Sequence, residues 1–129
     1  MKGAKVEAMV LFAHGARAAR WAQPLLRLQD ELAQRAPGLR IEIAYLELQA
    51  PDLPQVLEDL ARAGIARIRI APVFWSLGGH VVRDLPALVD EFHARRPAVR
   101  VEVLPVLAEL PGLLEFLAAA LLGADGAPR

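Results

Sequence analysis

Apolar residues along the chain alternate between short compact runs and wider, helix-like spacings. Residues 6–12 form a mostly apolar run of strand length, whereas residues 21–36 carry Leu25, Leu28 and Leu32 at spacings of three and four. A short apolar run bounded by turn residues predicts a buried strand, and spacings of three and four predict an amphipathic helix. The chain therefore opens with a strand followed by a helix.

The order of strand and helix recurs three more times. The further predicted strands are residues 39–48, 66–74 and 99–107, and the further predicted helices are one that Asp52 caps and Gly64 ends, one over residues 85–96 that Asp84 caps, and one over residues 110–122. Because right-handed crossovers leave few other arrangements, this alternation predicts an α/β fold with a doubly wound four-stranded parallel sheet in the order 2-1-3-4 and helices on both faces. We expect one domain over residues 1–129, ordered over about 6–122, with a frayed C-terminal tail.

Composition narrows the classes of function. The chain has 129 residues, of which 55% are hydrophobic and 23% charged, as expected of a folded domain. Lys and Arg together balance Asp and Glu at 15 each, so no net field favours nucleic acid as a partner. The absence of cysteine excludes thiolate metal sites, which leaves imidazole and carboxylate as ligands. No run is long enough for a signal peptide or a membrane span, so we expect a cytoplasmic protein without a membrane partner.

Three side chains with metal-binding chemistry fall near predicted strand ends. In the order 2-1-3-4, ligands bind beyond the carboxyl ends of strands one and three, where successive connections diverge. His14 directly follows the first strand, His80 follows the third on a loop with two glycines, and Glu47 lies near the end of the second. Two imidazoles and a carboxylate suit Co, Ni, Fe or Zn. Imidazole titrates near pH 6.5, so these groups can also move protons.

Each of these residues also has a purely structural interpretation. His14 equally suits a hydrogen bond at the strand end, Glu47 a solvated carboxylate, and Gly78 and Gly79 a flexible turn. Their meeting at one sheet edge favours a site. His93 differs, because it lies in the last turn of a predicted helix, where positive charge suits the helix dipole, and we expect it on the surface.

Apolar and basic residues surround the two histidines. Trp75 and Leu77 precede His80 and suit a flat hydrophobic ligand. Arginine binds carboxylates through two parallel hydrogen bonds, and Arg17, Arg20 and Arg83 stand near the histidines. The local composition therefore fits an apolar ligand with an acidic rim.

Motifs for other chemistries are missing. The glycine-rich signatures of dinucleotide and nucleoside triphosphate sites are absent, as is the serine-hydrolase elbow, so no nucleotide cofactor is expected. Ser76 is the only serine, and threonine is absent. A hydrolase in which His80 activates Ser76 stays open as an alternative that needs no metal.

Three stretches carry a family resemblance that spans nearly the whole chain. They are LFAHGAR at residues 11–17, IAYLEL at 43–48 with PDLPQVLEDLARAGIARIRIAPVFW at 51–75, and GGHVVRDLP at 78–86. At these residues the sequence resembles the short sirohydrochlorin cobaltochelatases, CbiX-type class II chelatases that insert a metal into a tetrapyrrole without nucleotide hydrolysis.

The resemblance implies a chelatase-like domain, a homodimer, a tetrapyrrole substrate and a divalent metal substrate, cobalt first and nickel or iron next. It places the functional histidines on His14 and His80, as catalytic residues and metal ligands, and the metal-binding glutamate on Glu47. With it, we expect the substrate-binding residues to be Arg17, Trp75, Leu77, Gly78, Gly79 and Arg83.

The chain departs from the family pattern after the first histidine. Ala16 replaces a frequent serine, and Ala18 and Ala19 replace Asp-Pro, so a hydroxyl and a carboxylate are missing. A noncatalytic metal or tetrapyrrole carrier of the same fold is therefore an alternative to the enzyme. A purely structural flavodoxin-like module is another, and it predicts that replacing either histidine changes stability alone.

Overall fold

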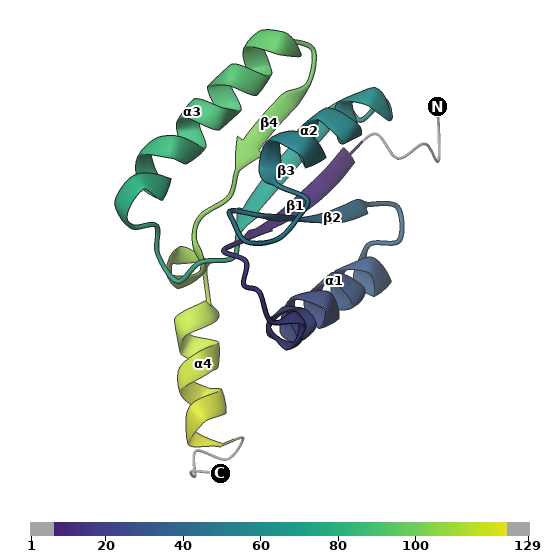
Figure 1. The fold of residues 1–129 in the computed structure, drawn as a ribbon. Coiled ribbons are helices and arrows are strands. Elements are labelled where there is room, and N and C mark those ends of the chain that lie inside the picture. Colours follow the sequence, from purple (N-terminus) through teal and green to yellow (C-terminus); the bar gives the residue numbers. More distant parts are fainter. Residues whose placement is uncertain (1–6, 124–129) are drawn as a thin grey trace.

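The computed structural model describes residues 7–123, except for the side chains of Ala19, His80 and Val82. The elements follow one another as β1 (Glu7–Ala13), η1 (Ala19–Ala22), α1 (Gln23–Arg35), β2 (Arg40–Tyr45), α2 (Leu53–Arg62), β3 (Arg67–Pro72), α3 (Gly79–Arg95), β4 (Arg100–Val103), η2 (Leu107–Glu109) and α4 (Leu113–Leu122) (Figure 1). The predicted frayed tail covers residues 123–129, of which residues 124–129 lie outside the described residues.

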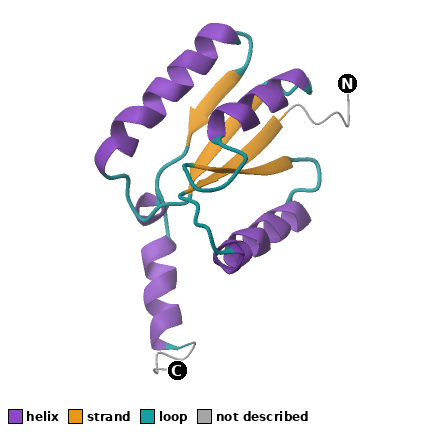
Figure 2. Ribbon diagram, viewed as in Figure 1, coloured by secondary structure: helices purple, strands orange, loops and turns teal. Residues whose placement is uncertain are grey.

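The four strands form one parallel sheet in the order β2-β1-β3-β4, which confirms the predicted topology. β1 lies inside the sheet, where Leu11 pairs with Ile43 of β2 and with Ala71 of β3. Because all strands run the same way, their carboxyl ends meet along one side of the sheet, here called the carboxyl edge. α1 covers one face of the sheet, and α2 and α3 cover the other (Figure 2).

The side chains of β1 alternate between two buried clusters. Ala8, Val10 and Phe12 pack with the buried residues of α2 and α3, whereas Leu11 and Ala13 pack under α1. Successive residues of a strand point to opposite faces, so a strand with helices on both sides is apolar throughout. This explains why the sequence showed a nearly continuous apolar run here.

The start of α2 follows the prediction. Asp52 is its N-cap, and the Asp52 carboxylate accepts a hydrogen bond of 3.0 Å from the backbone N–H of Gln55. Such a cap satisfies one of the N–H groups that the first turn of a helix leaves without a partner.

The start of α3 corrects the prediction. Asp84 does not cap the helix, because α3 begins at Gly79 and Asp84 lies inside it. Val81, Leu85 and Phe92 are all buried, so the apolar face of the helix starts ahead of Asp84 and draws the earlier residues into it. Pro86 therefore stands inside the helix rather than in its first turn.

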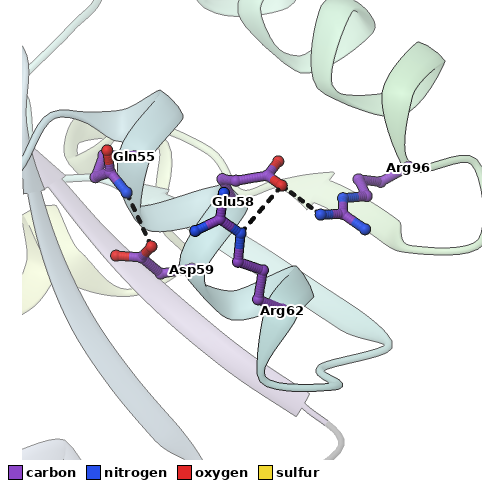
Figure 3. Close-up of polar contacts among 5 residues, drawn as sticks. All are labelled: Gln55, Glu58, Asp59, Arg62 and Arg96. Atoms are coloured by element: carbon purple, nitrogen blue, oxygen red, sulfur yellow. Dashed lines mark hydrogen bonds and ion pairs between the residues drawn. The ribbon is translucent and has the colours of Figure 1, made fainter.

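Ion pairs tie α2 to the end of α3 (Figure 3). The Glu58 carboxylate accepts a hydrogen bond from the Arg96 guanidinium and lies 3.7 Å from Nε of Arg62, while Gln55 donates to Asp59 along the same helix. The bond from Arg96 holds the pKa of the Glu58 carboxyl below its usual value, although burial acts in the opposite direction. These contacts lie near the amino ends of the strands, away from the carboxyl edge.

Helices cover both faces of the sheet, as predicted, but α4 is not one of them, because it projects away from the sheet (Figure 1). Its main contacts are with η2, and none of its residues is buried. Phe116 is 66% exposed and Leu121 77% exposed. The chain turns away at Gly112, whose φ of 84° is in the left-handed region that glycine tolerates.

Among residues 7–123, no helix has both the length and the apolar character that a bilayer crossing requires.

Candidate metal site at the carboxyl edge

Two of the three predicted metal ligands meet at the carboxyl edge. His14 directly follows β1, and Glu47 comes two residues after β2 ends. His14 Nε2 lies 3.5 Å from Glu47 Oε2, and the two side chains are 53% and 51% exposed. The pair is therefore open to an ion arriving from solution.

Backbone hydrogen bonds hold the two loops together beyond the strands. The N–H of Leu46 donates to the carbonyl of Ala13 at 2.8 Å, and the N–H of Glu47 donates to the carbonyl of His14 at 3.1 Å. Backbone hydrogen bonds between the two segments thus continue from the strands into the loops. These bonds place the His14 and Glu47 side chains side by side.

Gly15 lets the two loops approach closely. Its φ is 95°, and a Cβ atom at this position would lie 2.0 Å from the carbonyl oxygen of Glu47. Any other residue would combine a strained backbone with a clash against main-chain atoms. Glycine at position 15 is therefore a condition for the His14–Glu47 pair.

Both ring nitrogens of His14 face an oxygen that can only accept a hydrogen bond. The Nδ1 atom lies 3.1 Å from the carbonyl oxygen of Gly15, which can only accept a hydrogen bond. A neutral ring donates to only one of these oxygens, and the distance of 3.1 Å to the Gly15 carbonyl, against 3.5 Å to Glu47, favours the tautomer with the proton on Nδ1 and the lone pair on Nε2. An imidazole lone pair beside a carboxylate oxygen is a pair of ligands that a divalent metal cation accepts.

Aromatic residues connect the core to this pair. Phe74 packs edge-on against the buried Phe12, with ring centroids 5.5 Å apart, and lies 6.5 Å from the His14 ring. Trp75, predicted to contact a ligand, is 56% exposed. Leu77, predicted to face the same ligand, is half-buried and packs partly against the core.

His80 lies on an element that differs from the prediction. It is the second residue of α3 and not part of a loop, because the helix begins at Gly79 with Gly78 as its N-cap. Both glycines are exposed. The His80 side chain lies outside the described part of the structure. Among the side chains that are described, no three His, Asp or Glu groups gather into a metal site.

The predicted basic residues are open to solvent. Arg17, Arg20 and Arg83 are exposed, and the ion pairs found among the described residues involve none of them. His93 is exposed in the last turn of α3, as the sequence predicted.

An apolar groove of about 340 Å³ lies between α1 and the carboxyl ends of the strands, and the sequence did not predict it. Trp21 and Leu28 form one wall and remain partly exposed, and Ala13 and Val73 belong to the chain just before His14 and Phe74. The spacing of Leu25, Leu28 and Leu32 predicted a buried helix face, but periodicity does not show how far a neighbouring element covers that face.

Gln49 is a residue of this edge that the sequence did not reveal. Its side-chain oxygen accepts a hydrogen bond of 2.8 Å from the N–H of Ala16, 33 positions earlier. This bond links the loop after β2 to the loop after β1. Nothing in the sequence pattern indicates a partner at that distance along the chain.

Comparison with known proteins decides the family. The model of the CbiX family matches residues 8–123. The chain belongs to the CbiX family.

Two related sequences are sirohydrochlorin cobaltochelatases. This CbiX chain is 33% identical to the one from Methanocaldococcus jannaschii over 84 residues, which is 65% of the chain and 59% of the relative. It is 27% identical to the one from Methanococcus maripaludis over 84 residues, 65% of the chain and 58% of the relative. The CbiX chain thus matches less than two thirds of the length of these relatives.

Solved structures share the fold. A putative cobalamin biosynthesis CbiX protein from Marinobacter aquaeolei matches with a TM-score of 0.75 and 23% identity, over 89% of this chain and 93% of that one. SirB from Bacillus subtilis with Fe³⁺ matches with a TM-score of 0.74 and 20% identity, over 95% of this chain and 48% of SirB.

The close approach at Gly15 yields a stability prediction. Gly15→Ala should lower the free energy of unfolding by at least about 1–2 kcal/mol, because the left-handed backbone is strained and the new Cβ meets Glu47. Gly38→Ala is the matched control, since Gly38 has open space around it and no left-handed φ, and should change stability by less than about 0.5 kcal/mol. Urea unfolding measures both variants. Equal stability of the two would contradict the loop contact.

Proposed function

We propose that this CbiX-family chain inserts a divalent metal ion, cobalt first, into sirohydrochlorin or a related tetrapyrrole without a nucleotide. The observation that carries the proposal is the exposed pair of His14 Nε2 and Glu47 Oε2, 3.5 Å apart at the carboxyl edge. The names of the relatives from M. jannaschii and M. maripaludis support the tetrapyrrole and cobalt. A SirB structure from B. subtilis subspecies spizizenii holds cobalt and another SirB structure holds Fe³⁺, so iron is the next candidate.

The chemistry of insertion suits these donors. A divalent ion enters the ring as two pyrrole N–H protons leave it, so the protein must give up a cation and take up two protons. His14 Nε2 and Glu47 Oε2 hold the ion through lone pairs, and the same lone pairs accept protons once the ion has left. His80, on the first turn of α3, is the proposed second imidazole.

An open site favours transfer over storage. The metal here is a substrate, so it must bind weakly enough to leave. A closed cage of four protein ligands would retain it. Side chains that are about half exposed leave coordination positions for water and for the ring nitrogens.

The surroundings of the pair suit the macrocycle. Trp75 offers an exposed aromatic surface to the ring, and Leu77 adds an apolar contact. Gly78 and Gly79 carry no side chains that would block close approach. Arg17 and Arg83 are proposed to bind the peripheral carboxylates.

Replacement of the proposed histidine ligands tests the proposal. His14→Ala and His80→Ala should each slow cobalt insertion by roughly 100-fold, because each removes a lone pair needed for the ion or for a proton. His93→Ala is the matched control and should keep the wild-type rate, because His93 is exposed on the far end of α3. The assay mixes purified protein with sirohydrochlorin and Co²⁺ and follows the absorbance change against the uncatalysed reaction.

Two outcomes would contradict the proposal. Wild-type insertion rates in both His14→Ala and His80→Ala would show that the assigned site is wrong. Metal binding by the wild-type chain without any acceleration of insertion would identify a carrier instead of an enzyme.

We further propose that the chain acts as a homodimer. α4 exposes Leu114, Phe116, Leu121 and Leu122, and it packs on neither face of its own sheet. Glu115 is the only charged residue of this helix. A two-fold dimer is the commonest way to cover such a surface, and the apolar groove beside α1 has a matching character.

The assembly has a direct test. Light scattering during size-exclusion chromatography should give twice the chain mass of 14.0 kDa at micromolar concentration. The double variant Phe116→Glu, Leu121→Glu should give a monomer, because two charges cannot be buried against an apolar partner. Ala33→Glu on the exposed side of α1 is the control and should stay dimeric. A wild-type chain that is monomeric throughout would contradict the dimer.

A further inference from the structure

One peptide group beside the His14–Glu47 pair makes contacts at both its N–H and its carbonyl. The N–H of Ala16 donates to the side-chain oxygen of Gln49 at 2.8 Å, and the carbonyl of Gly15 lies 3.1 Å from His14 Nδ1. This N–H and this carbonyl belong to the same peptide bond. Because a peptide bond is planar, whatever orients its N–H also orients its carbonyl.

We propose that Gln49 is a positioning residue for His14, acting through the Gly15–Ala16 peptide. By holding the N–H of Ala16, Gln49 turns the Gly15 carbonyl toward the ring. The carbonyl keeps the proton on His14 Nδ1, and Nε2 faces Glu47 with its lone pair free. The inference rests on the proposed function in that His14 serves there as a metal ligand.

The backbone at Gly15 explains why an anchor is needed. Glycine restricts the rotation of its neighbouring peptide groups less than any other residue does. The close approach to Glu47 requires glycine at position 15, so the backbone alone does not hold the orientation of the next peptide. The bond to Gln49 supplies this missing restraint.

The loop that carries Gln49 is itself fixed. Glu47 is bonded to the His14 carbonyl, and the Tyr45 N–H donates to the carbonyl of Pro51 at 2.9 Å, so backbone bonds flank Gln49 on both sides. Gln49 is half-buried, whereas Glu47 is exposed. One loop therefore provides both a carboxylate ligand and the group that sets the tautomer of the imidazole ligand.

A hydrogen-bonded partner on the second ring nitrogen is a recognised way to orient a metal-binding histidine, and its loss typically costs 10–100-fold in metal affinity. Gln49 is one step further out, since it acts on the carbonyl that bonds the ring. We therefore expect its removal to weaken Co²⁺ binding by about 10-fold, at the lower end of that range.

The first experiment reads the tautomer in metal-free protein. The chain has three histidines, so His80→Gln with His93→Gln leaves His14 as the only imidazole. At pH 8, where free imidazole is neutral, ¹⁵N chemical shifts distinguish a protonated ring nitrogen from an unprotonated one. We expect protonated Nδ1 in this background. Adding Gln49→Leu, which removes the acceptor, should shift the ring toward the tautomer with the proton on Nε2.

The second experiment measures Co²⁺ affinity by calorimetry in protein with all its histidines. Gln49→Leu should weaken binding by about 10-fold, whereas Gln49→Glu should stay within about threefold of wild type, because a carboxylate still accepts from Ala16. Gln49→Met, which keeps an unbranched side chain, replaces the leucine variant if thermal unfolding shows that leucine destabilises the fold.

The outcomes separate this inference from the proposed function. An unchanged tautomer together with unchanged Co²⁺ affinity in the leucine or methionine variant would overturn the role of Gln49, even if the chain inserts cobalt. Equal losses in the glutamate and leucine variants would also overturn it, because the acceptor would then be irrelevant. A tautomer that depends on Gln49 in a chain without insertion activity would contradict the proposed function alone.

Discussion

The close contact between the loops that follow β1 and β2 is the constraint on which the proposed site depends. Parallel pairing brings the two strand ends to the same edge, and the bonds from Leu46 and Glu47 continue the backbone hydrogen bonding past the strands. The loops meet only because Gly15 has no side chain. From this contact follow the position of His14, the position of Glu47 and the distance between them.

The ion pairs that join structural elements and the side chains of the candidate site lie at opposite ends of the strands. The Glu58 cluster joins α2 to the end of α3 near the amino ends of the strands, and Arg67 pairs with Glu7 and Glu102 at the same end. The His14–Glu47 pair stands at the opposite edge, half exposed. An arginine at that edge would compete with an incoming cation for the Glu47 carboxylate, so this separation suits the proposed metal site.

Much of the fold could be predicted because periodicity reports on local structure. The apolar run of β1 and the cap at Asp52 identified their elements, and the alternation of elements gave the sheet order. Asp84 was misleading, because a residue that is favoured at an N-cap can also lie inside a helix when the apolar face extends past it. The position of α4 could not be predicted, since an apolar helix indicates burial without indicating the partner that covers it.

The candidate site likewise contains residues that local sequence patterns indicate and residues that they do not. His14 and Glu47 were found because strand ends are visible in the sequence and topology brings them to one edge. Gln49 was not found, because its bond to Ala16 depends on how two loops cross in space. The groove beside α1 was missed because helix periodicity does not show that Trp21 and Leu28 are left partly uncovered.

The central claim is that the His14–Glu47 pair holds the metal substrate at the carboxyl edge. Anomalous X-ray diffraction from crystals soaked in Co²⁺, recorded on both sides of the cobalt absorption edge, tests this most directly. We expect a cobalt peak at about 2.1 Å from both His14 Nε2 and a carboxylate oxygen of Glu47, typical of nitrogen and oxygen ligands of such ions. Cobalt bound elsewhere on the chain, with this pair left unoccupied, would contradict it.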